Sequence, residues 1–385
     1  MRPVILVGPL PPPFDGLSTS FQMLVDGVEK QHLPYTVVSL SGKGKSYGGT
    51  ASWGRALQYL RILLDYFGKS IFGKKTIYIT IAQSCHGFFR DFIMIWFAWL
   101  NGHRIICHLN GGNYDNFYEA QPKWMQWLIR KTLLKVDNIL VLGKRLRDMY
   151  NFEPRLKDKI CVVQNGLPFA LNEAVKPKAL PVDKAKPIRI LYLSNLIESK
   201  GYLDLLEAVR ILMKEYEMPV VCHFCGLFLT NKPDDVLVHD AIHGQRLFED
   251  FVTTNNLKKN VAYRGVVSGE EKNRELRDAH FFVLPTNYNN EGQPVSIIEA
   301  MAFGNVVVST DYRAIPDMVI HEKTGFLVPY GQPKVIARVI ADTMANPEMY
   351  SKISKSALEY FQRHFTREAH LNKIVPILKN PINLC

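Results

Sequence analysis

The chain has 385 residues, of which 47% are hydrophobic and 22% are charged. This composition can build full hydrophobic cores, and the length suggests two or three domains. The formal net charge of +11 predicts attraction to anions, namely nucleic acid, anionic lipid or phosphorylated substrates, without choosing among them.

Secretion and membrane insertion are not favoured by this sequence. The N-terminus runs directly into the apolar segment 3–7, which is too short for a signal peptide. The longest apolar run, 92–100, has about half the length of a membrane span. The cysteines are scattered, which indicates a reduced protein rather than a disulfide framework (Cys85, Cys107, Cys161, Cys222, Cys225 and Cys385). We therefore expect a cytoplasmic protein that is soluble or peripheral to the inner face of the plasma membrane.

The first half of the chain alternates between short apolar runs and helix-like segments. Helical periodicity appears around Phe21, around Leu60 and from Phe88 to Leu100. Strands are expected at 4–7, 36–40, 76–82, 104–109, 138–142 and 159–163. This alternation predicts a doubly wound α/β domain with a parallel sheet at residues 1–170.

The first strand is followed by a proline-rich loop that contains Gly16, and Ser18 or Thr19 is expected to cap the next helix. A strand, a glycine-bearing loop and a helix N-terminus together can hold an anion, although a purely structural loop is the alternative. The later run Ser41-Gly42-Lys43-Gly44-Lys45-Ser46 resembles a phosphate-binding loop only superficially. Ser39 occupies the position of its first glycine, so we reject an ATPase interpretation.

His108 and Asn110 stand at the end of the fourth expected strand. Because strand side chains alternate, the two face the same way. Ligands of open parallel sheets bind beyond the carboxyl ends of the strands, which is where both residues lie. The alternative is that His108 is a satisfied core residue.

The segment 123–159 is strongly basic. It carries ten Lys and Arg against four acids, and Trp124 and Trp127 lie among the bases. Basic helices with tryptophan suit an anionic membrane surface. The alternative is a solvated face with core tryptophans.

The stretch from Phe169 to Pro187 is rich in Ala, Lys and Pro, so we predict a linker at residues 171–187. A second α/β domain is expected at residues 188–349, followed by C-terminal helices at 350–385. Within it, Cys222 and Cys225 form a lone Cys-x-x-Cys pair inside an apolar strand. Core packing is favoured there over a metal site.

The most informative stretch runs from Leu284 to Ala302. Glu291 precedes a helix that can begin at Pro294, and Glu299 lies inside that helix. The free N–H groups and the dipole of the helix N-terminus favour a phosphate, and the two carboxylates accept hydrogen bonds from hydroxyls. A nucleotide-sugar combines both features. The alternative is that Glu291 caps the helix and Glu299 is solvated.

The sequence Glu-Gly-Gln-Pro at 291–294, Glu-Ala-Met-Ala at 299–302 and the segments 306–310 and 322–328 resemble the donor site of retaining glycosyltransferases of family 4. Group 1 glycosyltransferases of bacterial surface polysaccharide and lipopolysaccharide synthesis belong to this type. The resemblance implies the GT-B fold, in which two doubly wound Rossmann-like domains face each other across a cleft. It also implies that the last helix crosses back to the first domain.

The resemblance implies a role for each matching residue. Glu299 would bind the ribose and Glu291 the donor sugar. Lys200, which with Gly201 retains the Lys-Gly pair of the family, would stabilise the departing diphosphate together with the backbone. The catalytic candidates are Glu291, Lys200, Asn110 and His108. The donor-binding candidates are Gly16, Asn195, Lys200, Gly265, Val266, Glu291, Gly292, Gln293, Pro294, Val295 and Glu299.

Two positions depart from the family pattern. Asn195 replaces the usual arginine of the diphosphate clamp, and Arg264 or Arg313 is a candidate for the missing cation. Asn110 replaces a histidine that often contacts the donor sugar, and His108 is a candidate to compensate.

The implied reaction moves a sugar from a UDP- or GDP-sugar to a lipid-linked or polysaccharide acceptor, with the leaving phosphate taking the acceptor's proton. No cofactor and no metal are expected. The alternatives are a sugar-nucleotide epimerase of GT-B fold and a non-catalytic anion-binding protein. No nucleic-acid-binding module is recognisable. No pattern in the sequence identifies the nucleotide base, the donor sugar, the acceptor or the oligomeric state.

Overall fold

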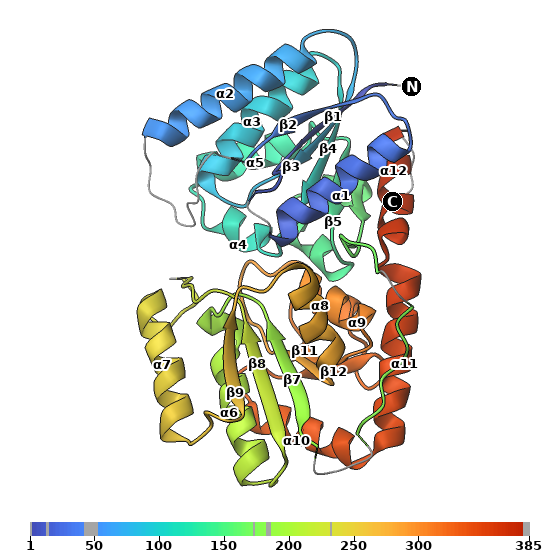
Figure 1. Cartoon of the computed structure of the whole chain (residues 1–385). Coiled ribbons are helices and arrows are strands. Elements are labelled where there is room, and N and C mark those ends of the chain that lie inside the picture. The colour runs from blue at the N-terminus through green and yellow to red at the C-terminus, as the bar shows by residue number, and fades with distance from the viewer. Residues whose placement is uncertain are drawn as a thin grey trace. The chain divides into compact units, whose positions relative to one another are not determined.

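The computed structural model describes residues 2–12, 15–41, 53–171, 174–181, 186–231 and 233–379. The chain forms two compact units (Figure 1). Unit 1 comprises Met1–Ala170 and Thr366–Cys385, and unit 2 comprises Leu171–Phe365. Most of the phosphate-loop-like run, residues 42–46, lies outside the described residues.

Unit 1 contains a six-stranded sheet in the order β2-β1-β3-β4-β5-β6, and all pairings in it are parallel. Most of its strand residues are buried, which is why the strands appear in the sequence as nearly continuous apolar runs. The strands are β1 (Val4–Gly8), β2 (Tyr35–Ser39), β3 (Thr76–Thr80), β4 (Arg104–Leu109), β5 (Asn138–Val141) and β6 (Ile160–Val162). The helices are α1 (Gly16–Lys30), α2 (Trp53–Ser70), α3 (Cys85–Leu100), α4 (Tyr114–Glu119), α5 (Lys123–Leu133) and α12 (Arg367–Lys379).

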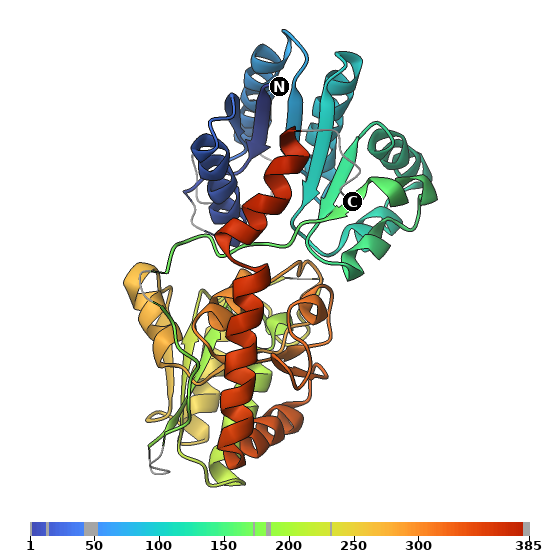
Figure 2. The same cartoon turned by 90° about the vertical axis from the view of Figure 1, so that its right-hand side faces the viewer.

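Helices cover both faces of this sheet. α1 and α12 pack together on one face, where their apolar residues share a core cluster with β1, β3 and β4. α2, α3 and α5 lie on the opposite face (Figures 1 and 2). Arg367 of α12 also pairs with Asp26 of α1 at 3.1 Å, so the C-terminal helix is an integral part of unit 1.

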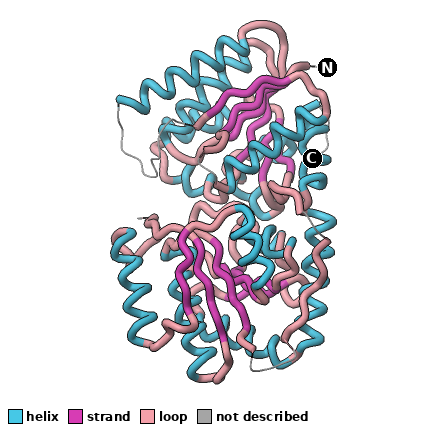
Figure 3. The backbone as a smooth tube through the Cα atoms, in the orientation of Figure 1, coloured by secondary structure: helices cyan, strands magenta, loops and turns pink. Residues whose placement is uncertain are grey.

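Unit 2 repeats this architecture of a sheet flanked by helices (Figure 3). Its sheet is parallel, in the order β12-β11-β10-β7-β8-β9. Its strands are β7 (Ile188–Leu193), β8 (Val220–Cys225), β9 (Val261–Gly265), β10 (Phe281–Leu284), β11 (Val306–Thr310) and β12 (Gly325–Val328). Its helices are α6 (Tyr202–Lys214), α7 (Ala241–Thr254), α8 (Gly269–Asp278), α9 (Val295–Ala302), α10 (Pro333–Ala345) and α11 (Pro347–His364). The predicted α/β class with two doubly wound parallel sheets is therefore confirmed.

Several local predictions need correction. Asp15, rather than Ser18 or Thr19, caps α1, because its carboxylate accepts a hydrogen bond from the Ser18 N–H at 2.8 Å. Pro294 is the residue before α9 rather than its first helical residue. Cys161 is disulfide-bonded, which departs from the expectation of free thiols throughout.

The segment 171–187 belongs to unit 2 in the structure. Lys178 attaches it there, since its ammonium donates hydrogen bonds to the carbonyls of Leu276 and Ala279 and to Asn305 Oδ1. Burial lowers the pKa of Lys178 to about 7. Among the described residues, none of the helices combines the length and the apolar character needed to cross a bilayer.

Candidate functional site

A buried ion pair joins two of the predicted site residues in unit 2. Lys200 Nζ lies 3.3 Å from Glu291 Oε2, and the two side chains are only 16% and 9% exposed. Glu291 Oε2 also accepts a hydrogen bond from the Thr286 hydroxyl at 3.3 Å. Lys200 Nζ stands 4.8 Å from the ring centroid of Tyr288. These residues lie beyond the carboxyl ends of β7 and β10, adjacent strands of the sheet, which is where open parallel sheets bind ligands.

The loops that carry this pair are held together by backbone contacts. The Asn287 N–H donates to the Ser199 carbonyl at 2.6 Å. Gly201 has φ 76°, and a Cβ at this position would lie 2.2 Å from the Pro285 carbonyl oxygen. Only glycine combines this backbone conformation with such a close approach. The Lys-Gly pair of the sequence therefore has a physical reason, since Gly201 allows Lys200 to reach Glu291.

Glu299 forms a second lysine–glutamate pair. It is 6% exposed, and its Oε1 lies 2.5 Å from Lys272 Nζ of α8. Burial raises the pKa of the Glu299 carboxyl, and the Lys272 ammonium partly offsets that rise. The alternative interpretation of Glu299 as a solvated helix residue is thus wrong.

Lys272 was missed in the sequence because nothing in the polar helix 269–278 distinguishes it from its charged neighbours. The two arginines considered as replacements for the clamp arginine missing at Asn195 have other neighbours. Arg264 pairs with Glu275 at 3.2 Å, and the Arg313 guanidinium lies 5.4 Å from the ring centroid of Tyr312. Neither forms a described ion pair with Glu291 or Glu299.

Asp234 is a further residue that sequence reasoning missed. Its Oδ2 accepts hydrogen bonds from the Asn289 N–H at 2.9 Å and from Asn231 Nδ2 at 2.6 Å. The Ser199 hydroxyl lies 3.5 Å from the same oxygen. Asp234 therefore connects three loops around the Lys200–Glu291 pair. No local pattern could have revealed this role, because Ser199 and Asn289 lie 35 and 55 residues from Asp234 in sequence.

The remaining donor-binding candidates of unit 2 divide into two groups. Gly292, Gln293 and Pro294 are buried and lead directly from Glu291 into the N-terminus of α9 at Val295. Asn195, Gly265 and Val266 form the second group, because no hydrogen bond or ion pair among the described residues joins them directly to Lys200 or Glu291. Asn195 is still a neighbour of Lys200, since the Tyr192 hydroxyl donates to the backbone carbonyls of both residues, at 3.1 and 3.5 Å. Asn195 Oδ1 instead accepts a hydrogen bond from the Leu227 N–H at 3.3 Å. Gly265 has open space where a Cβ would lie, and the Val266 side chain is exposed.

In unit 1, His108 and Asn110 line the same small cavity, whose volume is about 10 Å³. This is the size of a single water molecule. His108 is buried, and its Nδ1 shares a hydrogen bond with the Tyr78 hydroxyl at 2.6 Å. Its Nε2 has no hydrogen-bond partner among the described residues. His108 is therefore a core residue that is only half satisfied.

A second histidine lines this cavity. His370 of α12 donates from Nδ1 to the Gln164 carbonyl at 2.7 Å, which leaves its Nε2 as an acceptor. Burial lowers the pKa of His370 to about 4. Burial, with the nearby His370, lowers the pKa of His108 to about 3. Both rings are therefore neutral at pH 7, and the cavity suits an uncharged hydroxyl or water.

Gly16, the last donor-binding candidate, is the first residue of α1. The Asp15 carboxylate and the Ser18 hydroxyl form a reciprocal capping box at this helix N-terminus. An acidic side chain therefore already occupies the position where we expected an anion. Among the described residues, no three His, Cys, Asp or Glu side chains gather as metal ligands.

Residues 176–360 match the family model for glycosyl transferases group 1. Unit 2 therefore contains a group 1 glycosyl transferase domain. The Lys200–Glu291 and Lys272–Glu299 pairs both lie inside the matched region of this domain.

Similar proteins agree with this assignment. The chain is 30% identical to the amylovoran biosynthesis glycosyltransferase AmsK of Erwinia amylovora over 40% of this chain and 35% of that protein. It is 26% identical to the putative colanic acid biosynthesis glycosyltransferase WcaL of Escherichia coli over 58% of this chain and 52% of that protein. The chain thus spans about half or less of the length of these relatives.

The fold is shared with solved glycosyltransferase structures. The HepE protein of Anabaena in complex with UDP-glucose aligns with a TM-score of 0.68 over 98% of this chain and 99% of that one. At 14% identity this likeness shows the fold alone, which is GT-B.

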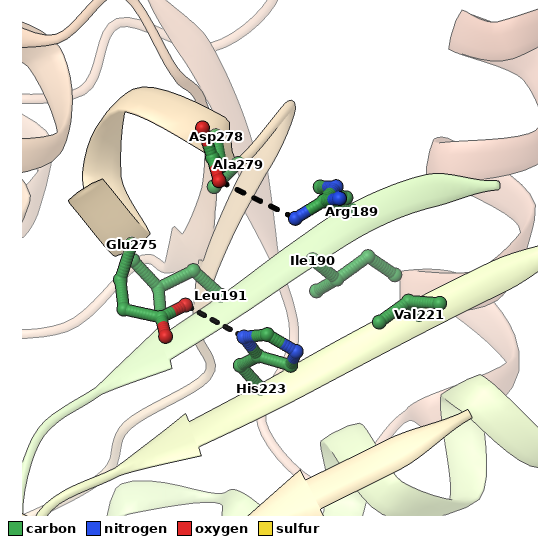
Figure 4. A pocket seen from close by; sticks show the side chains of 8 residues that line it. All are labelled: Arg189, Ile190, Leu191, Val221, His223, Glu275, Asp278 and Ala279. Carbon is green, nitrogen blue, oxygen red and sulfur yellow. Dashed lines mark hydrogen bonds and ion pairs between the residues drawn. The ribbon is translucent and has the colours of Figure 1, made fainter. Parts of the chain in front are cut away.

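The glycosyl transferase domain also has a small cavity that none of the predicted site residues lines (Figure 4). It is lined by charges that pair with one another. His223 Nδ1 lies 2.6 Å from Glu275 Oε2, and Arg189 lies 3.4 Å from Asp278. Because these groups satisfy each other, we assign no ligand to this cavity.

We expect Gly201→Ala to destabilise the glycosyl transferase domain by about 2 kcal/mol or more, because it combines a left-handed backbone with a clash against Pro285. Gly331→Ala is the matched control, since Gly331 has φ 68° but open space around the new Cβ. Chemical denaturation followed by circular dichroism measures both variants. An equal loss in the two would contradict the role of the Gly201–Pro285 contact.

We also expect unit 1 to lose stability in acid because of its buried neutral histidines. The pKa of His370 is about 4 in the folded protein, below the value of about 6.5 for an unfolded chain. Between these values only the unfolded chain binds the proton, so the stability present above pH 6.5 is lost as the pH falls. From pH 7 to pH 5, the wild type should lose about 2 kcal/mol more than His370→Gln.

Tryptophan fluorescence can follow this unfolding selectively, because all five tryptophans lie between Trp53 and Trp127 in unit 1. The exposed His86 offers a control, and His86→Gln should keep the pH dependence of the wild type. Identical pH profiles for the wild type and His370→Gln would contradict the inference.

Proposed function

We propose that this protein is a retaining glycosyltransferase that moves a sugar from a UDP- or GDP-sugar to a lipid-linked or polysaccharide acceptor. The observation that carries the proposal is the buried Lys200–Glu291 pair in front of the N-terminus of α9, inside the glycosyl transferase domain. The biosynthetic roles printed for AmsK and WcaL support an acceptor of the cell-surface glycan type. The UDP-glucose bound to HepE supports a nucleotide-sugar donor.

The geometry suits recognition of a donor that is part hydroxyl and part phosphate. Glu291 uses Oε2 to contact Lys200 and Thr286, and its Oε1 has no hydrogen-bond partner among the described residues. We assign Oε1 to a hydroxyl of the donor sugar. Glu299 likewise uses Oε1 for Lys272, and we assign its other oxygen to a ribose hydroxyl.

The leaving diphosphate would lie against the N-terminus of α9. The helix dipole and the free backbone N–H groups of its first turn favour negative charge there. Lys200 adds a positive charge at the same end of the sheet. In the resting protein this lysine is paired with Glu291, so an arriving diphosphate would share it. Such preorganised groups stabilise charge that grows in the transition state, and a single one contributes about 3 kcal/mol.

Neither glutamate is assigned as an attacking nucleophile. The departing phosphate would accept the proton of the acceptor hydroxyl, so the protein supplies binding and electrostatic stabilisation rather than a base. A lipid-linked acceptor would place the enzyme on the inner face of the plasma membrane, with unit 1 in contact with anionic lipid.

We expect UDP or GDP to raise the melting temperature of the protein, whereas DNA of similar charge should not. A ligand present at a hundred times its dissociation constant adds about 2.7 kcal/mol of stability. A thermal melt over a series of nucleotide concentrations measures this. Protection by DNA without protection by either nucleotide would favour a general anion-binding protein and contradict the proposal.

Glu291→Gln and Lys200→Ala should each reduce sugar transfer at least tenfold while the protein remains folded, because each removes one half of the pair that positions the donor. A panel of UDP- and GDP-sugars, assayed for release of the nucleoside diphosphate, measures this. The exposed pair Lys355–Glu359, at 4.0 Å in the same unit, supplies matched controls. Lys355→Ala and Glu359→Gln should retain full activity. Full activity in either Glu291→Gln or Lys200→Ala would contradict the assignment of this pair to the donor site.

A further inference from the structure

Helix α3 of unit 1 is apolar on the side that faces away from the sheet. Its buried side includes Phe88, Met94 and Ile95, as expected for a helix packed on a sheet. On its other side, Phe89 and Ile93 are each 40% exposed and Leu100 is 72% exposed. A surface helix normally carries polar residues there, and a helix that is apolar all round is buried by something. Its charged residues, Arg90 and Asp91, pair with each other at 2.6 Å.

The neighbouring helices extend this surface. On α2, the stripe of Leu57, Leu60 and Leu64 has helical spacing and is exposed along its whole length. On α5, Trp124 and Trp127 are 59% and 54% exposed. We define the apolar helix face of unit 1 by the nine exposed side chains of these three helices, namely Leu57, Leu60, Leu64, Phe89, Ile93, Trp99, Leu100, Trp124 and Trp127.

Ring contacts join the helices that carry this face. The rings of Phe89 on α3 and Trp124 on α5 stack at 6.5 Å between centroids. The rings of Phe67 on α2 and Phe97 on α3 lie 4.5 Å apart. α2 and α3 run side by side on the sheet face opposite α1 and α12 (Figures 1 and 2). Exposed apolar side chains gathered on helices that pack against one another mark an interaction site.

The charges of the same helices indicate that a partner of this face is negatively charged. α2, α3 and α5 together carry seven Lys and Arg against two acids, Asp65 and Asp91. Both acids are paired within their own helix, Asp65 with Lys69 at 2.7 Å and Asp91 with Arg90. This leaves a net excess of five positive charges, from seven minus two.

Lysines and tryptophans are in direct contact at this face. Lys131 Nζ lies 5.8 Å from the ring centroid of Trp127. Lys135 Nζ, just beyond α5, lies 3.5 Å from the ring centroid of Trp99. Aliphatic side chains flanked by tryptophan and lysine match the layers of an anionic bilayer, which are hydrocarbon, interface and charged headgroup. The core of a protein interface is instead depleted of lysine.

We propose that the apolar helix face of unit 1 docks on the surface of an anionic lipid bilayer. The aliphatic side chains enter the boundary between headgroups and acyl chains, the tryptophans lie at headgroup level, and the lysines contact lipid phosphates. This proposal rests on the proposed function, because docking on the bilayer would bring the enzyme to a lipid-linked acceptor. It extends the basic surface expected in the sequence, because α2 and α3 add exposed aliphatic and aromatic side chains to the tryptophans of α5.

Sedimentation of the full chain with lipid vesicles tests the docking. We expect binding to vesicles of phosphatidylglycerol and phosphatidylcholine, weaker binding to phosphatidylcholine alone, and a decrease with rising salt. Tryptophan fluorescence should shift to shorter wavelength on binding, because three of the five tryptophans, Trp99, Trp124 and Trp127, are exposed on this face and leave water.

Substitutions at exposed positions separate this surface from the rest of the protein. Trp124→Ser combined with Trp127→Ser should weaken vesicle binding at least tenfold, and Leu60→Ser should weaken it measurably. Ile242→Ser is the matched control, since Ile242 is 68% exposed but lies on α7 of unit 2. Circular dichroism checks that each variant is folded.

The outcomes distinguish the two proposals. If the wild type does not bind anionic vesicles, or if Ile242→Ser impairs binding as much as the tryptophan variant, the docking proposal is overturned even if UDP or GDP still protects the protein. If vesicle binding follows the expected pattern but no nucleotide gives protection, the docking stands and the glycosyltransferase proposal fails.

Discussion

The ion pair between Lys200 and Glu291 is the interaction on which the organisation of unit 2 around its site depends. Burying two charges costs several kcal/mol of desolvation for each, and the structure recovers this only with good geometry and additional hydrogen bonds. Thr286 and the ring of Tyr288 supply such contacts. The glycine at 201 and the Asn287–Ser199 hydrogen bond then hold the two loops at the separation that the pair requires.

A second pair gives the site its balance of charge. Lys272 neutralises Glu299 much as Lys200 neutralises Glu291, so two carboxylates stand near α9 without a net excess of negative charge. This matters for a ligand that carries a diphosphate, because unpaired carboxylates would repel it. Asp234 is different, because its hydrogen bonds hold loops in place.

The two units differ in chemistry. Unit 2 has paired charges at the carboxyl ends of its strands, and unit 1 has two neutral histidines beside a cavity of water size. Unit 1 also carries all the tryptophans, and four of the five lie on α3 and α5. The two units share one architecture, but the polar candidate site lies in unit 2 and the apolar, basic surface lies in unit 1.

The sequence by itself determined the α/β class, most strands to within a residue or two, and the Glu291–Lys200 candidates. It could do so because buried parallel strands appear as continuous apolar runs, and because the Glu-Gly-Gln-Pro and Lys-Gly contexts are local. β4 begins and ends where the pattern predicts, and the ends of the other five strands of unit 1 differ from the expected ranges by at most two residues. Helix periodicity also located α2 correctly, but it could not tell whether the stripe at Leu57, Leu60 and Leu64 faces a core or solvent.

Only the tertiary structure decided which distant residues meet. Lys272 lies 27 residues from Glu299 in sequence, Asp234 lies 55 from Asn289, and His370 lies 206 from Gln164. No local spacing encodes such pairs, because they form only when separate strands and helices pack together. The same packing turns the outer side of α3 away from its sheet, so apolar side chains such as Phe89, Ile93 and Leu100 are exposed.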